Sequence, residues 1–241
     1  MKKIITVILF LVVSFCSMQL HAQEKKEQIK NLPKFDLQYY HFGFVLSLNT
    51  SNLIIDFKEP SPQDTNLIAI KNLSKSGFNL GMVASLDLSG NWHIRFIPTL
   101  TFSERALEYT FILEDGSTEK IQKDINSTYI DFPILFKYRT NRMNNTAPYV
   151  LLGAQFSIDV ASQKDVDNTN AKDIIIKLDN TNFSGSAGVG VDFFLPYFKF
   201  GIELKANIGI KNLLIDDNTN FSAPLESLRS QSIMLSFTFE G

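Results

Sequence analysis

Residues 78–102 read FNLGMVASLDLSGNWHIRFIPTLTF, and every second side chain is apolar on both sides of the central Ser89-Gly90-Asn91. The side chains between them are mostly small, polar or charged. Side chains of a strand point alternately to opposite faces, so this pattern predicts two strands joined by a tight turn. Each run has 11 residues, the upper end of the roughly 9–11 that a tilted strand needs to cross a bilayer. The stretch therefore predicts a transmembrane β-hairpin with its apolar face toward lipid.

The N-terminus has the pattern of an export signal. A basic start, Met1-Lys2-Lys3, precedes the apolar run 4–15 and the small-residue site Leu20-His21-Ala22. This predicts a secretory signal peptide over residues 1–22, because the apolar run is too short for a membrane helix. Cys16 raises the alternative of a lipid anchor, but the bulky Phe15 before it is a poor match to the lipobox that precedes a lipidated cysteine. Without that anchor the mature chain begins at Gln23 and has no cysteine.

Composition narrows the class further. The chain has 241 residues and a net charge of -2, so no nucleic-acid partner is expected. After the signal peptide the sequence has no apolar run long enough for a membrane helix. It does have many short alternating runs, and it is rich in Phe, with 21 in the whole sequence. A closed barrel suits such a chain, because every backbone polar group in lipid must be paired.

The alternation predicts an all-β fold, an eight-stranded antiparallel transmembrane β-barrel. Residues 23–38 are expected to be a solvated, mobile periplasmic lead-in, and residues 39–241 the outer-membrane barrel. The connections after the first, third, fifth and seventh strands are long and the others shorter. Outer-membrane barrels have short periplasmic turns, so both termini are expected in the periplasm.

Two irregularities are expected in the barrel wall. The apolar positions of the third strand change from even to odd numbers at Leu107 and Tyr109, which predicts a β-bulge near residues 104–106. Pro98 and Pro133 would lie within about one residue of each other on neighbouring strands. Because proline cannot donate to the ladder, we expect a bulge or a weakened spot there.

Aromatic side chains support the same placement. The only Trp and five of the seven Tyr fall at the end of the barrel that carries the short turns. Tyr and Trp favour the membrane interface, where one end of the ring is apolar and the other wet. The predicted aromatic belt consists of Tyr39, Tyr40, Trp92, Tyr138, Tyr149 and Tyr197.

Charged side chains on the polar face should point into the lumen. An eight-stranded barrel is just wide enough for side chains to fill it, so we interpret these charges as an ion-pair network that plugs the barrel. The alternative is a proton path or a small polar site. The predicted lumen ion network consists of Asp87, His93, Arg95, Asp131, Lys137, Asp192, Lys199, Glu203 and Lys205.

The sequence has no pattern typical of catalysis or of a bound cofactor. His41 and His93 are isolated, and a metal site needs converging ligands. A Gly-x-Ser-x-Gly motif is absent, and Gly185, Gly188 and Gly190 alternate within a strand, where they suit close packing or curvature of the wall. We therefore expect no enzyme activity, no cofactor and no metal.

Three segments resemble a known family. They are Ser127–Lys137 (STYIDFPILFK), Pro148–Gly153 (PYVLLG) and Gly188–Phe200 (GVGVDFFLPYFKF). The first resembles the fourth-strand signature of PorT-type outer-membrane barrels of Bacteroidetes, called SprT in gliding bacteria. Residues 141–145 (NRMNN) and 195–200 resemble the PorT family itself. The resemblance covers essentially the whole mature chain.

This resemblance implies a role in secretion. The PorT family is an accessory outer-membrane component of the type IX secretion system, needed to export cargo with conserved C-terminal domains and involved in gliding motility. It implies outer-membrane lipid and other type IX components as partners, and no catalytic or cofactor residues. Two alternatives remain open: a generic outer-membrane barrel for adhesion or envelope integrity, and a soluble lipocalin-like ligand-binding barrel, which would keep its apolar face inside.

Overall fold

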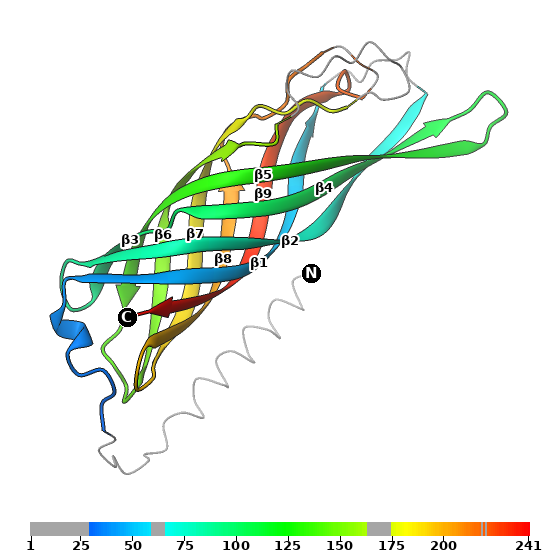
Figure 1. Ribbon diagram of the computed structural model, residues 1–241. Helices are drawn as coiled ribbons and strands as arrows, with labels where there is room; N and C mark the ends of the chain where they lie inside the picture. The colour runs from blue at the N-terminus through cyan, green and yellow to red at the C-terminus, as the bar shows by residue number, and fades with distance from the viewer. Residues whose placement is uncertain (1–28, 59–65, 163–174, 218, 220) are drawn as a thin grey trace, which may run out of the picture.

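The computed structural model describes residues 29–58, 66–162, 175–217, 219 and 221–241. The predicted signal peptide, residues 1–22, lies outside this range. No helix among the described residues is long and apolar enough to cross a membrane. The strands are β1 (Tyr40–Phe57), β2 (Leu67–Asp87), β3 (Trp92–Phe96), β4 (Thr99–Ile112), β5 (Thr118–Arg139), β6 (Thr146–Asp159), β7 (Thr181–Phe194), β8 (Lys199–Gly209) and β9 (Leu225–Glu240) (Figure 1). A short 3₁₀ helix, η2 (Phe35–Leu37), precedes them.

The strands form one antiparallel sheet that closes into a ring, which confirms the predicted all-β barrel. β1 pairs with both β2 and β9, so the first and last strands meet. β3 and β4 pair with the same two neighbours, β2 and β5, and together fill one place in the ring. The expected third strand is thus interrupted at residues 97–98, where Pro98 has no N–H to donate. The ring has eight places although nine strands are counted.

The interruption lies where the two prolines were expected to meet. Ile97 donates its backbone N–H to the carbonyl of Pro133, at 3.3 Å. β5 itself runs without a break past Pro133, which is opposite Gln155 of β6. The irregularity therefore affects only one of the two strands.

The predicted bulge near residues 104–106 is wrong. The pairing of β4 with β5 runs in unbroken register from Thr99 opposite Asp131 to Ile112 opposite Thr118. The extra residue is instead on β2, where the register against β4 shifts between Ser74 and Phe78. Leu107 and Tyr109 keep the inward direction of the residues before them, and both are fully buried. What changes along β4 is the chemistry of the interior, which turns from polar to apolar.

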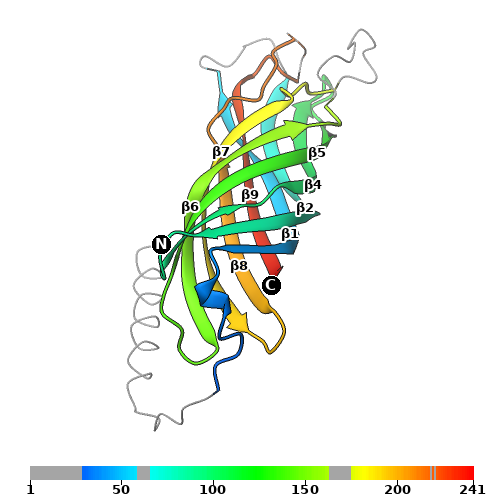
Figure 2. The same cartoon turned by 60° about the vertical axis from the view of Figure 1, so that its left-hand side comes forward.

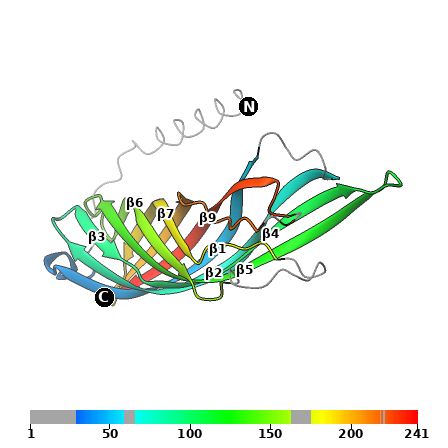
Figure 3. The same ribbon diagram turned by 90° about the horizontal axis from the view of Figure 1, so that it is seen from above.

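The two ends of the barrel differ. The connections β2–β3, β5–β6 and β7–β8 are short and lie at one end, here called the turn end; the longer connections lie at the other, the loop end (Figure 2). η2 and the end of β9 both lie at the turn end. At the loop end the β4–β5 hairpin reaches beyond the other strands (Figure 3).

Between the two ends the wall has an apolar outside and a polar inside, as the alternation predicts. Phe42, Phe44, Phe136 and Leu152 are among the exposed apolar side chains of the outer surface. Ser47, Asn79, Gln155 and Ser157 are among the buried polar side chains of the interior. This arrangement suits a wall that faces lipid and is the reverse of a lipocalin-type barrel.

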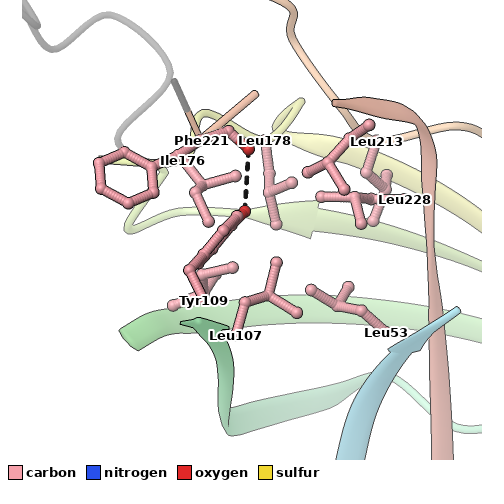
Figure 4. Close-up of a cluster of buried hydrophobic side chains, with 10 residues drawn as sticks. Leu53, Leu107, Tyr109, Ile176, Leu178, Leu213, Phe221 and Leu228 are labelled. Carbon is pink, nitrogen blue, oxygen red and sulfur yellow. Dashed lines mark hydrogen bonds between the residues drawn. The ribbon is translucent and has the colours of Figure 1, made fainter. Parts of the chain in front are cut away.

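A hydrophobic cap closes the interior at the loop end (Figure 4). Tyr109 of β4 lies in its centre and donates its hydroxyl to the carbonyl of Phe221, at 2.9 Å. The β6–β7 connection contributes Ile176 and Leu178, and the β8–β9 connection contributes Leu213 and Phe221. The buried members of the cap are Leu53, Leu107, Tyr109, Ile125, Ile176, Leu178, Leu213, Phe221, Leu225 and Leu228.

Candidate functional site

The lumen near the turn end holds a dense set of ion pairs. Arg95 of β3 bridges two carboxylates, Glu203 of β8 and Glu240 of β9, each at 3.0 Å. Lys199 also binds Glu240, at 2.9 Å. Because these strands all present inward positions at this level, the four side chains converge, and each is at most 4% exposed.

The same set extends across the barrel to β5 and β7. Lys137 lies 2.7 Å from Asp192, and Lys199 approaches Asp192 to 3.8 Å. Lys205 lies 3.5 Å from Glu203. We call the connected group the lumen network: Arg95, Lys137, Asp192, Lys199, Glu203, Lys205 and Glu240.

The remaining charged residues of the predicted set lie apart from the lumen network. Asp87 and His93 are hydrogen-bonded to each other, and His41 Nε2 lies 3.4 Å from Asp87, so these three form a separate cluster. Asp131 accepts a hydrogen bond from the Thr101 hydroxyl at 2.5 Å and has no cation within ion-pair distance among the described residues. The predicted single set is therefore divided into three.

Tyr149 was placed in the aromatic belt, and the structure contradicts that placement. It is 3% exposed and points into the lumen, where its hydroxyl donates to Glu203 at 3.2 Å and Lys137 lies 3.6 Å from its ring centroid. The prediction used only its position along the strand. Val150 and Leu152 face outward, so alternation directs Tyr149 inward.

The other five belt residues have outward, exposed side chains at the turn end. They are Tyr39, Tyr40, Trp92, Tyr138 and Tyr197. Trp92 and Tyr138 are opposite each other on β3 and β5, with ring centroids 4.9 Å apart. Their position suits the wet edge of an apolar wall.

Sequence reasoning missed Glu240, His41 and Arg105. Glu240 follows the outward Phe239, so alternation alone directs it inward. Arg105 was missed because the expected bulge ended the inward series of odd positions before it. Without that bulge, the series that begins at Arg95 would have included Arg105. His41 precedes the outward Phe42 and could have been found in the same way.

Residues 31–38, here called the N-terminal strap, lie across the mouth of the barrel at the turn end. Asp36 pairs with Arg139 at 2.9 Å and with Arg142 at 2.7 Å. Phe35 is 5% exposed and stacks on His41, with ring centroids 3.7 Å apart. The strap is therefore anchored to the barrel through Phe35 and Asp36, while most of its other side chains are exposed.

Within the described part of the chain, no three or more His, Cys, Asp or Glu side chains come together in a way that could hold a metal ion. The charged groups of the lumen network are engaged with one another. What this arrangement does is fill the interior at the turn end, while the hydrophobic cap closes it at the loop end.

The fold resembles solved bacterial outer-membrane proteins. OprG from Pseudomonas aeruginosa is 13% identical with a TM-score of 0.45, and the match covers 83% of this chain and 95% of that chain. Ail of Yersinia pestis, solved with the heparin analogue sucrose octasulfate, is 14% identical with a TM-score of 0.39 and coverages of 85% and 100%. Neisserial surface protein A is 11% identical with a TM-score of 0.37 and coverages of 81% and 96%.

A comparison with curated proteins gives no match. Residues 21–214 match the family described as outer membrane protein beta-barrel domain. This match takes in most of the chain, from the predicted end of the signal peptide to the connection that follows β8. The chain therefore belongs to the outer-membrane protein β-barrel domain family.

Proposed function

We propose that this barrel is an accessory outer-membrane component of the type IX secretion system, required for export of cargo with C-terminal domains and, in gliding bacteria, for motility. The observation that carries the proposal is the PorT-type sequence of residues 127–137, 148–153 and 188–200. These segments lie on the neighbouring strands β5 to β8. They supply Lys137, Asp192 and Lys199 of the lumen network, so the resemblance falls on residues that fill this barrel.

The filled lumen supports an accessory role over a passage for cargo. A folded or extended polypeptide would have to displace buried ion pairs at the turn end and the hydrophobic cap at the loop end. An eight-stranded barrel leaves little room beyond its own side chains. We propose that the protein acts through its lipid-facing wall and its two ends, with the turn end and both termini in the periplasm, where it contacts other type IX components.

A clean deletion strain tests the secretion role. We expect cargo with C-terminal domains to disappear from the culture medium and to accumulate in the periplasm, and a plasmid copy of the wild-type gene to restore export. Levels of the other outer-membrane secretion components are measured in the same strain, to separate a direct role from loss of the whole apparatus. An unchanged medium profile would reject the type IX assignment and leave the outer-membrane barrel intact.

The protruding β4–β5 hairpin favours a second candidate, a barrel for adhesion or envelope integrity. Residues 112–120 at its tip are all exposed, and they lie beyond the other strands at the loop end. A deletion strain that exports cargo normally but loses surface attachment or becomes sensitive to detergent would support this function. Shortening the hairpin tip should then reproduce the attachment defect without affecting assembly of the barrel.

A further inference from the structure

A polar cavity lies in the lumen between the lumen network and the hydrophobic cap. Its volume is about 40 Å³, room for about three water molecules. Its wall is built mostly from amide and hydroxyl side chains of inward positions. The charged residues of the wall are Arg105 and Asp131, and the neutral ones include Asn49, Asn79, Thr101, Gln155, Asn182 and Asn207.

Arg105 is the unusual member of this wall. It is 1% exposed, and both of its hydrogen bonds come from Nη2, which donates to the Ser127 hydroxyl at 2.6 Å and to the Tyr129 hydroxyl at 2.7 Å. Its Nε has no acceptor among the residues that the structure describes. No carboxylate of a described residue lies within 4.0 Å of the guanidinium, which also lies 5.5 Å from the centroid of the Tyr129 ring.

The other buried arginines of the barrel show what Arg105 lacks. Arg95 holds two carboxylates, and Arg139 holds Asp36. A buried charge is costly unless a counter-charge and hydrogen bonds compensate it. Among the described residues that line the cavity, Asp131 is the only one with a carboxylate. It is engaged by Thr101 and borders the adjoining space that Lys205 also lines.

We propose that the cavity binds one small inorganic anion of chloride's size against the guanidinium of Arg105. The anion supplies the negative charge that the described residues do not place beside this guanidinium. The cavity has room for a monatomic anion with a few waters and excludes a carboxylated metabolite or a nucleotide. The side-chain amides of Asn182 and Asn207 each use one N–H group, on Ser230 and Gln155, so each has a second N–H group that can donate.

Crystals of the folded chain grown in sodium bromide test the site directly. We expect an anomalous bromide peak in contact with the Arg105 guanidinium of the wild type. The Arg105→Gln variant, crystallised in the same way, should lack that peak. Bromide found only on the outer surface, or density next to Arg105 with no anomalous signal, would overturn the proposal.

A solution measurement covers the case in which Arg105→Gln fails to crystallise. The protein is heated to a series of temperatures before electrophoresis, and the midpoint is the temperature at which half of it changes from the folded to the unfolded migration. The midpoint is measured while chloride replaces gluconate at constant ionic strength. We expect the wild-type midpoint to rise and saturate with chloride, because a ligand that binds only the folded state stabilises it. Arg105→Lys should respond more weakly, and Arg229→Gln, at a partly exposed site paired with Asp56, should respond like the wild type. An equal response in all variants, or none in the wild type, contradicts the anion site.

Discussion

At the scale of single residues, the lumen is held by side chains that are distant in sequence. Arg95 reaches Glu203 and Glu240, which lie 108 and 145 residues further along the chain. Alternation predicts that each of these side chains points inward, and for most of them the sequence was sufficient. It does not predict which charge meets which, because the partners depend on the stagger of the strands around the ring. Asp131 illustrates this, since it points inward and lies apart from the lumen network.

Removing the central cation should destabilise the barrel strongly. Arg95→Met leaves two buried carboxylates short of a partner, so we expect a loss of about 3–5 kcal/mol in the free energy of unfolding. Urea titration of the protein in lipid vesicles measures this loss. Lys120→Met is the control, because Lys120 is 63% exposed in its pair with Glu108, and such surface pairs contribute about 0–1 kcal/mol. Equal losses of unfolding free energy in the two variants would show that the ion pairs of Arg95 stabilise the barrel no more than an exposed pair does.

Gly190 and Gly185 of β7 allow a second comparison between a test variant and a control variant. A Cβ atom at Gly190 would lie 2.4 Å from Cζ of Tyr149, whereas one at Gly185 would meet nothing within 4 Å. The sequence suggested close packing or curvature of the wall for these glycines, and of the two only Gly190 is closely packed. We expect Gly190→Ala to cost about 1–3 kcal/mol through overpacking and Gly185→Ala to cost far less. The same urea titration tests this, and a larger effect at Gly185 would show that the Tyr149 contact is unimportant.

At the scale of elements, β4 shows where sequence reasoning succeeded and where it failed. Its even positions were correctly placed on the outer face as far as Phe102. Beyond that point, apolar side chains at odd positions were interpreted as a change of face, although they line the hydrophobic cap. An apolar side chain can face lipid or a buried cap, and periodicity alone cannot distinguish the two. Predicting the cap would have required knowing that the loops around Leu178 and Phe221 fold back over β4.

The hydrophobic cap should lose stability in alkali through Tyr109, which lies beyond the membrane-spanning part of β4. Burial raises the pKa of Tyr109 above its ordinary value, so its phenol stays neutral in the folded protein while the unfolded chain ionises near pH 10. Its contribution to stability is full below about pH 10 and falls as the pH rises through the folded pKa.

Tyr109→Phe removes this dependence. The variant should lose about 1 kcal/mol at neutral pH, because the Phe221 carbonyl loses its donor. Above pH 10 the difference from wild type should shrink, as the wild type loses stability through Tyr109 and the variant does not. Urea midpoints measured from pH 8 to 11 give the difference directly. A difference that stays constant across this range would mean that the phenol is not buried in the cap.

At the scale of the whole molecule, the closed ring and its two unlike ends follow from the number and spacing of the strands. The alternation of short and long connections predicted that both ends of the barrel domain lie on one side, and η2 and the end of β9 do lie together. Their direction in the membrane stays a prediction. The docking of the N-terminal strap could not have been predicted, because Asp36 meets Arg139 and Arg142 only after distant parts of the chain have come together.

Cysteine labelling in intact cells tests this direction. The sequence has one cysteine, Cys16, within the predicted signal peptide, so single cysteines can be introduced without interference from the mature chain. We expect Glu119→Cys, at the tip of the β4–β5 hairpin, to react with a membrane-impermeant maleimide in intact cells. Ser89→Cys, in the β2–β3 turn, should react only after the outer membrane is permeabilised. The opposite pattern would invert the barrel.

The position of the N-terminal strap has a consequence for the order of assembly. The strap precedes all the strands, so an exported chain delivers it first. Asn31 of the strap is hydrogen-bonded to Asn145 and Phe194, which lie 114 and 163 residues further along the chain, and Asp36 binds Arg139 and Arg142. Phe35 can stack on His41 of β1 early, but these polar contacts cannot form until β5, the β5–β6 turn and β7 are in place. The first part of the barrel to arrive is therefore fully docked only after the later strands have taken their places.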